Sequence, residues 1–194
     1  MNDLKNKYQH TQIILASGSP RRQELLKGLD IPFSIQIKEV EEHYPENLKA
    51  DKITAYLARL KAGAFTNLKE NELIITADTI VWLENEALMK PVNDEDAQGL
   101  LLKLSGKAHE VYTSVCLKSA RKTRVFSDKT RVYFKQLSID EINYYIHKYK
   151  PFDKAGAYGA QDWIGYIAIE KLEGSYFNVM GLPVHKLYKE LLDF

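Results

Sequence analysis

The sequence lacks the features that would place it outside the cytoplasm or in a membrane. Its single cysteine, Cys116, excludes an intramolecular disulfide, and the surrounding apolar run Val111–Leu117 favours a buried, inert thiol over a nucleophile. No apolar run approaches the roughly 20 residues of a membrane-spanning helix. The polar start, Met1–His10, has no apolar stretch of the kind found in signal peptides. We therefore expect a cytoplasmic protein with no membrane partner.

An excess of one charge is also absent. Lys and Arg number 27 and Asp and Glu number 26, so we expect no nucleic-acid partner, and any anion site must be local. The chain has no internal repeat, low-complexity tract or Pro/Gly-rich linker, and its 194 residues are enough for a substantial core. We expect an irregular N-terminus over residues 1–10 and a single domain over residues 11–194.

The most informative segment is a short strand, turn and helix near the N-terminus. The run Ile13–Leu15 predicts a buried strand, Ser19 is a natural N-cap, and Pro20 suits the first helical position. Arg21 and Arg22 then occupy the first helical turn, although the helix macrodipole favours anions there. A phosphate bound by free backbone N–H groups and both guanidinium groups would explain this choice. A capped surface helix with two solvated arginines is the alternative.

Helical and strand patterns alternate along the rest of the chain. Predicted helices begin at Asp51, Asn93 and Ser138, and a last helix follows Gly181-Leu182-Pro183 and ends near Leu192. The predicted strands are Pro32–Ile37, Leu73–Thr79, a hairpin that turns at Glu84-Asn85, Val111–Leu117 and Arg124–Phe134. This order, with several hairpins, predicts an α/β fold with a mixed sheet and flanking helices.

Several charged residues are candidates for chemistry. Asp78 follows an apolar strand and could bind a metal or take a proton from water, although capping of the next turn explains it equally well. Glu41-Glu42 offers the oxygen ligands that Mg²⁺ or Mn²⁺ needs when phosphates supply the others, and a solvated loop is the alternative. Lys90 is usually an ordinary surface lysine, but it could return beside Asp78. Lys61 lies on the helix that begins at Asp51, where a solvated face is the usual explanation.

The loop 153–161 is rich in small residues, which allow a ligand to approach the backbone closely. Gln161 offers both a donor and an acceptor, as reading the edge of a base requires, and a flexible loop is the alternative. Three tyrosines on one predicted helix, Tyr144, Tyr145 and Tyr149, indicate a dimer face or ordinary packing.

Taken together in this order, these segments resemble the Maf family of nucleoside triphosphate pyrophosphatases, from Leu15 to about Leu191. The resemblance is carried by LASGSPRRQELL (15–26), ADTIV (77–81), KPVNDEDA (90–97), LSGKAHEVYTSV (104–115), DKAGAYGAQ (153–161) and GSYFNVMGLP (174–183). Each motif is weak alone, but six in register are highly specific. Thr76 and Asp162 depart from the family pattern, which has glycine at both positions.

The resemblance implies an elongated α/β fold with two lobes around a deep cleft, similar to inosine triphosphate pyrophosphatases, and a homodimer. It implies hydrolysis of a nucleoside triphosphate to monophosphate and pyrophosphate with Mg²⁺ or Mn²⁺, and the loop 153–161 resembles that of the branch acting on dTTP and UTP. The implied catalytic residues are Asp78, Lys61 and Lys90, the metal ligands are Glu42 and Asp78, and the substrate-binding residues are Ser17, Arg21, Arg22, Thr79 and Gln161.

Two other functions are compatible with these residues. One is the same reaction on another base, such as 7-methyl-GTP or a modified pyrimidine. The other is a nucleotide-sensing regulator, for instance of cell division, with little turnover. Asp78, Lys61 and Lys90 favour an enzyme, because a pure binding protein would need the arginines but no general base.

Overall fold

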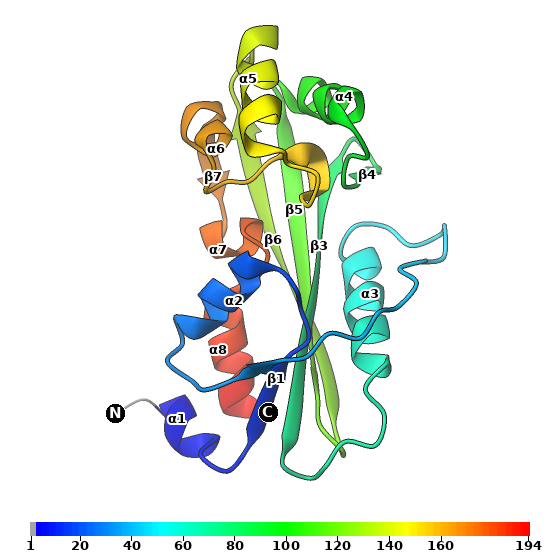
Figure 1. Cartoon of the computed structure of the whole chain (residues 1–194), viewed down its shortest axis with the longest axis vertical. Coiled ribbons are helices and arrows are strands. Elements are labelled where there is room, and N and C mark those ends of the chain that lie inside the picture. The colour runs from blue at the N-terminus through cyan, green and yellow to red at the C-terminus, as the bar shows by residue number, and fades with distance from the viewer. Residues whose placement is uncertain (1–2) are drawn as a thin grey trace. The chain divides into compact units, whose positions relative to one another are not determined.

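The computed structural model describes residues 3–194, which form a mixed seven-stranded sheet with flanking helices (Figure 1). The strands are β1 (Gln12–Leu15), β2 (Ser34–Ile35), β3 (Glu72–Leu83), β4 (Glu86–Leu88), β5 (Ala108–Lys118), β6 (Thr123–Phe134) and β7 (Ile169–Glu173). Their order is β2-β1-β3-β5-β6-β7, with β4 paired to β3. β1 pairs parallel with β2 and with β3. β4 pairs antiparallel with β3, and β7 pairs antiparallel with β6. The predicted α/β class with a mixed sheet is confirmed.

Helices alternate with the strands of this sheet along the chain. They are α1 (Asp3–Lys7), α2 (Pro20–Lys27), α3 (Asp51–Gly63), α4 (Asp94–Leu104), α5 (Ile139–Tyr149), the short 3₁₀ helix η1 (Ala155–Ala157), α6 (Trp163–Ala168), α7 (Tyr176–Val179) and α8 (Val184–Asp193). None of these helices, in the part of the chain that the structure describes, has the length and apolarity that crossing a bilayer requires.

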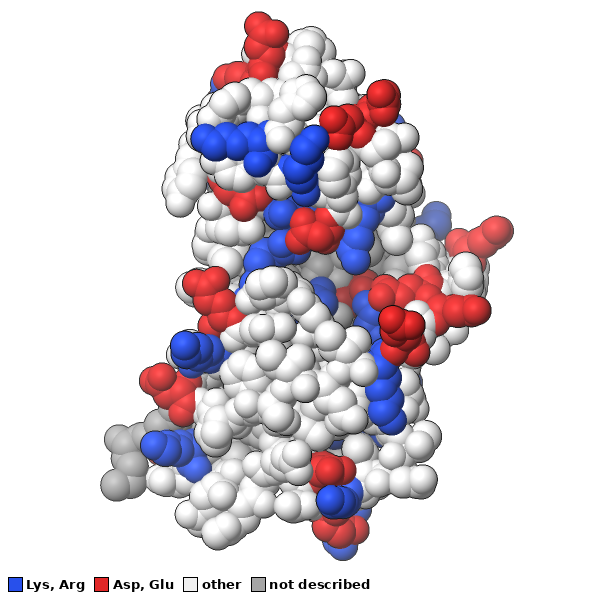
Figure 2. Space-filling view, viewed as in Figure 1, with Lys and Arg blue, Asp and Glu red and all other residues white. Residues whose placement is uncertain are grey.

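The chain divides into two compact units, which correspond to the two predicted lobes. Unit 1 comprises Met1–Asp78, Thr113–Asp128 and Gly181–Phe194, and unit 2 comprises Thr79–Tyr112 and Lys129–Met180. The division therefore falls inside the three long strands β3, β5 and β6. Lys and Arg side chains are interspersed with Asp and Glu on the face seen in Figure 2, as the balanced composition predicts.

In unit 1, α2 and α8 lie to one side of the strands and α3 lies to the other (Figure 1). The described start of the chain forms α1 where the sequence predicted an irregular segment. Leu4 and Tyr8 are buried, and the Tyr8 hydroxyl donates to the Leu191 carbonyl of α8 over 2.8 Å. This packing against α8 stabilises a helix that would be too short to persist alone.

Buried and partly buried hydrogen bonds attach α3 to its neighbours in unit 1. The Thr54 hydroxyl donates to the Asp51 carbonyl (3.0 Å) and lies 2.6 Å from the Ser114 hydroxyl, which lies 2.7 Å from that of Ser127. On β3, the fully buried Thr76 donates to the Ala58 carbonyl of α3 over 2.6 Å. Threonine suits this position because its branched side chain favours strands and its hydroxyl finds an acceptor.

Cys116 is fully buried against α3, where it packs with two alanines, Ala58 and Ala62. Burial raises the pKa of its thiol to about 11. The thiolate is the nucleophilic form of cysteine, so this residue is inert near neutral pH. The predicted buried, unreactive thiol is therefore confirmed.

Unit 2 is built around one hydrophobic core that includes apolar side chains of β5, α4 and α5. The predicted hairpin is confirmed, because Glu84 and Asn85 have φ values of 48° and 69° between β3 and β4. The predicted helix starts are also confirmed: Asn93 accepts a capping bond from the Asp96 backbone, and Ser138 forms a complete capping box with Glu141.

Two strand predictions need correction. The segment Pro32–Ile37 forms only the two-residue strand β2, and both of its side chains are exposed, because β2 pairs only with β1. The strand predicted to end at Thr79 continues to Leu83, because residues 80–83 are also β-formers and extend into the hairpin with β4. Asp78 therefore lies inside β3 and not at its end.

A buried histidine belongs to the core of unit 2. His109 is 2% exposed, and its Nε2 lies 2.8 Å from the Tyr158 hydroxyl. Its ring packs edge-on against the rings of Phe134 and Tyr158. Burial lowers the pKa of His109 from 6.5 to about 3, so the imidazole is neutral in the folded protein near neutral pH.

This histidine makes stability dependent on pH. The unfolded chain takes up a proton on His109 near pH 6.5, whereas the folded chain does so only near pH 3, so stability falls as the pH falls through this range. His109 alone contributes a slope of about 1.4 kcal/mol per pH unit below its unfolded pKa. Urea unfolding at pH 7 and pH 4.5 should show a weaker pH dependence for His109→Gln than for the wild type. The exposed His147 supplies the control, because His147→Gln should keep the wild-type slope. An unchanged slope in His109→Gln would contradict the assignment.

Candidate active site

The turn between β1 and α2 brings backbone and side-chain donors together in unit 1. Ser19 occupies the predicted N-cap and Pro20 the first helical position, but the Ser19 side chain makes no capping bond. The backbone of Ser19 instead donates to the Ser17 hydroxyl over 3.3 Å, and Ser17 is buried. The open N-terminus of α2 is therefore edged by Ser17 and followed at once by Arg21 and Arg22, as an anion site requires.

Arg22 is held in place from two sides. Its Nε donates to the Gly181 carbonyl over 2.9 Å, and its Nη1 donates to the Ser17 hydroxyl over 3.5 Å. Burial lowers the pKa of Arg22, the carboxylates of Asp78 and Glu42 oppose this effect, and Arg21 adds to it. A guanidinium remains charged near neutral pH despite such shifts. These electrostatic interactions bring four of the predicted site residues into one neighbourhood.

Two carboxylates converge on one lysine in the same unit. Nζ of Lys61, from α3, lies 2.6 Å from Oδ1 of Asp78 and 2.8 Å from Oε2 of Glu42. The side chains of Lys61 and Asp78 are 16% and 10% exposed, whereas that of Glu42 is 48% exposed. Lys61 therefore does not project into solvent as an ordinary surface lysine would. Within this cluster one positive charge faces two negative ones, and Arg22 interacts with the same two carboxylates.

This donor set suits a hard divalent cation. Among residues 3–194, no three His, Cys, Asp or Glu side chains gather in a way that would hold a metal alone. The carboxylates of Asp78 and Glu42 do lie close together, because both contact the same Nζ of Lys61. Mg²⁺ is usually bound by one or two carboxylates together with substrate phosphates, so this pair fits the predicted ion.

The other predicted residues belong to unit 2. Thr79 is partly buried in β3, Lys90 is exposed after β4, and Gln161 is partly buried at the end of the loop 153–161. A link joins this loop to the segment that carries Lys90, because the Gly156 backbone donates to the Met89 carbonyl over 3.1 Å. Gly156 has φ of +67°, a left-handed value that favours glycine.

Glycine is also required at Gly156 by its neighbour in β3. A Cβ there would lie 2.9 Å from Cγ2 of Val81, two residues beyond Thr79 in the same strand. Contacts thus join the loop both to this part of β3 and to the segment of Lys90 within unit 2.

Some contacts that shape these sites could not be read from the sequence, although the residues that make them were noted there. The Gly181 carbonyl fixes Arg22 from 159 residues away, and Tyr145 and Asp162 hold the end of the loop 153–161. Such contacts depend on the tertiary fold, so local pattern could not reveal them. A helix cap or a hairpin turn, by contrast, depends on residues that are close together in the sequence and can be predicted from them.

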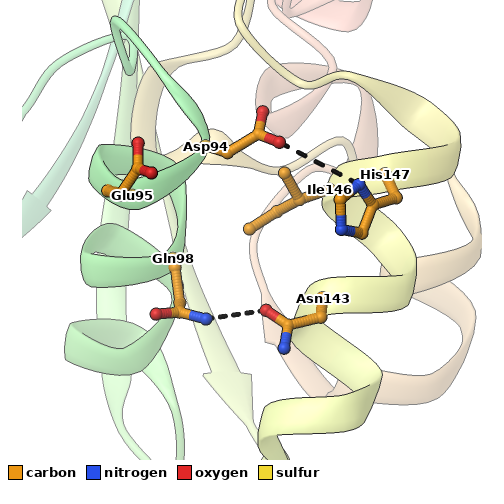
Figure 3. A pocket seen from close by; sticks show the side chains of 6 residues that line it. All are labelled: Asp94, Glu95, Gln98, Asn143, Ile146 and His147. Carbon is orange, nitrogen blue, oxygen red and sulfur yellow. Dashed lines mark hydrogen bonds and ion pairs between the residues drawn. The ribbon is translucent and has the colours of Figure 1, made fainter.

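A hollow of about 290 Å³ between α4 and α5 contains none of the predicted site residues. Its lining is Asp94, Glu95, Gln98, Asn143, Ile146 and His147 (Figure 3). The amides of Gln98 and Asn143 hydrogen-bond to each other over 2.6 Å, and Asp94 lies 4.0 Å from the His147 ring. Acidic residues in the first turn of α4 also complement the helix macrodipole, so the arrangement is explained by helix stability.

Comparison with known proteins places these observations in a family. The model of the Maf-like protein family matches residues 12–194. A dTTP/UTP pyrophosphatase of Flavobacterium psychrophilum is 54% identical over 98% of this chain and 98% of its own length. A dTTP/UTP pyrophosphatase of Flavobacterium johnsoniae is 56% identical over 97% of both chains.

A solved structure adds evidence on the fold. A HAM1 protein from Coxiella burnetii superposes with a TM-score of 0.53 over 95% of this chain and all of its own, at 16% identity. Identity this low supports the fold alone, whereas the family match and the sequence relatives span nearly the whole chain. The chain belongs to the Maf-like protein family.

Proposed function

We propose that this protein hydrolyses dTTP and UTP to the nucleoside monophosphate and pyrophosphate. The observation that carries the proposal is the cluster in unit 1 of Asp78, Lys61 and Glu42, electrostatically coupled to Arg22. Relatives more than half identical over nearly their full length bear the name dTTP/UTP pyrophosphatase, which supports the same activity here.

The triphosphate binds at the turn between β1 and α2. Backbone N–H groups at the start of α2 and the hydroxyl of Ser17 donate to phosphate oxygens, and Arg21 and Arg22 balance their charge. The bond from Arg22 to the Gly181 carbonyl fixes the guanidinium before substrate arrives, so little reorganisation is needed on binding.

Asp78 accepts a proton from the water that attacks the α-phosphorus, and pyrophosphate leaves on the opposite side. Lys61 holds the Asp78 carboxylate in position and, with Arg22, neutralises charge that develops on the phosphate oxygens. Lys90 is assigned to the leaving pyrophosphate on the basis of the family resemblance. Positioning and charge stabilisation supply most of the catalysis in phosphoryl transfer.

A divalent cation, Mg²⁺ or Mn²⁺, would be held by Asp78 and Glu42 and would supply further charge neutralisation for the phosphates. Gln161 and Thr79 contact the base, and Arg21 contributes to base selection. The assignment of Thr79 and Gln161 to the base rests on the family resemblance. The homodimer and the cytoplasmic location stay predictions from the sequence.

The test is pyrophosphate release from a panel of triphosphates with Mg²⁺ or Mn²⁺: dTTP, UTP, CTP, ATP, GTP, 7-methyl-GTP and modified pyrimidines. We expect kcat/KM for dTTP and UTP to exceed that for CTP by about tenfold or more, the equivalent of one net hydrogen bond. Activity mainly on 7-methyl-GTP would indicate the sister activity. Tight nucleotide binding with no release from any substrate would indicate a sensor and refute the enzymatic proposal.

A further inference from the structure

The amide of Gln161 and the carboxylate of Asp162 form a bonded pair at the end of the loop 153–161. Nε2 of Gln161 donates to Oδ1 of Asp162 over 3.1 Å. The other carboxylate oxygen, Oδ2, accepts a hydrogen bond from the Tyr145 hydroxyl over 2.8 Å. Nζ of Lys154 lies 3.7 Å from the same Oδ2. Asp162 is thus held at both oxygens by groups that donate or carry positive charge.

Tyr145 is rigidly held and anchors the Asp162 carboxylate. It is fully buried in the core of unit 2, and its ring stacks on that of Tyr149 at 5.2 Å. Its hydroxyl also accepts the backbone N–H of Gly159 over 3.1 Å. Burial and the Asp162 carboxylate raise the pKa of Tyr145 far above its usual range, so the hydroxyl keeps its proton and donates to Asp162.

Gly159 leaves the space that the pair occupies. A Cβ at this position would lie 2.5 Å from Oδ2 of Asp162 and 2.8 Å from Nε2 of Gln161. Real Cβ atoms do not approach other atoms so closely, and both neighbours are already bonded. The absence of a side chain at Gly159 therefore permits the contact between the Gln161 amide and the Asp162 carboxylate.

The carboxylate decides which way the Gln161 amide faces. A carboxylate can only accept hydrogen bonds, so it must face the NH₂ group of the amide, and Oε1 must face the other way. Oε1 is buried and receives no hydrogen bond from the part of the chain that the structure describes. A buried acceptor without a donor is unfavourable, and a donor on a bound ligand would relieve it.

We propose that Asp162 is a positioning residue that fixes Gln161 with Oε1 as an acceptor for a ring N–H of the nucleobase. Uracil and thymine carry such a donor at ring position 3, whereas the same ring nitrogen of cytosine is an acceptor and meets Oε1 unfavourably. The orientation set by Asp162 therefore selects dTTP and UTP over their cytosine counterparts. This inference rests on the proposed function, and it assigns the choice between pyrimidines to a residue that does not itself contact the base.

The decisive variant is Asp162→Asn. The asparagine amide can donate to Oε1 of Gln161, so the glutamine can turn and offer Nε2 to the ring nitrogen of cytosine. We expect the ratio of kcat/KM for dTTP to that for dCTP to fall by about tenfold, by a loss on dTTP and a gain on dCTP. Tyr145→Phe removes the donor to Oδ2 and should shift the ratio in the same direction by a smaller factor.

The chain offers a matched control pair in unit 2. The Tyr133 hydroxyl donates to the exposed carboxylate of Glu173 over 2.9 Å, the same kind of bond as that from Tyr145 to Asp162. Tyr133→Phe and Glu173→Gln should leave the ratio at its wild-type value. A dTTP analogue methylated at ring position 3 should be a poor substrate for the wild type and should lose less in Asp162→Asn.

An unchanged ratio in Asp162→Asn, or an equal fall on both nucleotides in a folded variant, would overturn the inference. Thermal melting establishes that each variant is folded. If the wild type releases no pyrophosphate from either nucleotide, the proposed function fails separately. The ratio of dissociation constants for dTTP and dCTP, measured by calorimetry, then tests the role of Asp162 without turnover, with the same expected tenfold shift.

Discussion

Asp78→Asn is expected to lower kcat by about 10²–10⁴-fold, because it removes the group that accepts the proton of the attacking water. Asparagine has nearly the same shape but no negative charge, so the change tests chemistry more than packing. The dissociation constant for dTTP should change far less than kcat, because Arg21, Arg22 and the start of α2 still bind the phosphates. Single-turnover kinetics and calorimetry measure the two effects separately.

Asp128 supplies a closely matched control for this variant. Its side chain is 10% exposed and lies 2.7 Å from Lys186 Nζ, and the Asp78 side chain is also 10% exposed and lies 2.6 Å from Lys61 Nζ. Asp128→Asn should therefore cause a comparable structural disturbance but retain turnover. Near-normal turnover in Asp78→Asn would contradict the assignment. Recovery of turnover at high Mn²⁺ would assign Asp78 to metal binding instead of proton transfer.

Arg22→Ala is expected to lower kcat/KM by about 10²–10³-fold, or about 3–4 kcal/mol, by analogy with the loss of a donor to developing negative charge. The guanidinium is aimed by the Gly181 carbonyl and the Ser17 hydroxyl, so the substitution removes a donor that is oriented before substrate binds. Arg22→Lys keeps the charge but cannot make the paired N–H contacts, so it should recover only part of the loss. Pyrophosphate release at several ionic strengths measures both variants.

A second arginine serves as the control for this loss. Arg121 is 81% exposed and pairs with Glu70 at the surface of the same unit, so Arg121→Ala should leave kcat/KM unchanged. If Arg22→Ala retained wild-type kcat/KM while folded, the phosphate site would not be at the start of α2.

Short-range features of the fold could be predicted because their causes are adjacent in the sequence. The capping box at Ser138, the cap at Asn93 and the turn at Glu84-Asn85 each involve residues within three positions of one another. The alternation of helices and strands likewise indicated the mixed α/β class. These elements are decided by local backbone preferences, which tertiary contacts reinforce here.

The composition of the candidate site was only partly predictable. The residue types and their order pointed to Ser17, Arg22 and Asp78, but nothing in the pattern placed Lys61 between two carboxylates. The continuation of β3 beyond Asp78 and the formation of α1 also depend on partners far along the chain, β4 and α8. Distant partners such as these override local propensity, and one sequence alone does not reveal them.

The hydrogen bonds among the hydroxyls of Thr54, Ser114 and Ser127 all run in one direction, toward the Asp51 carbonyl of α3. Each hydroxyl has one proton to give. With Thr54 donating to the Asp51 carbonyl at 3.0 Å, Ser114 donates to Thr54 at 2.6 Å in preference to the same carbonyl at 3.4 Å, and Ser127 donates to Ser114. Only this one assignment of protons satisfies all three bonds. Sliding α3 along the sheet would break these bonds together with the one from Thr76. These bonds fix the position of α3 against the strands. The backbone that carries Lys61, two turns further along the same helix, is therefore held in place as well.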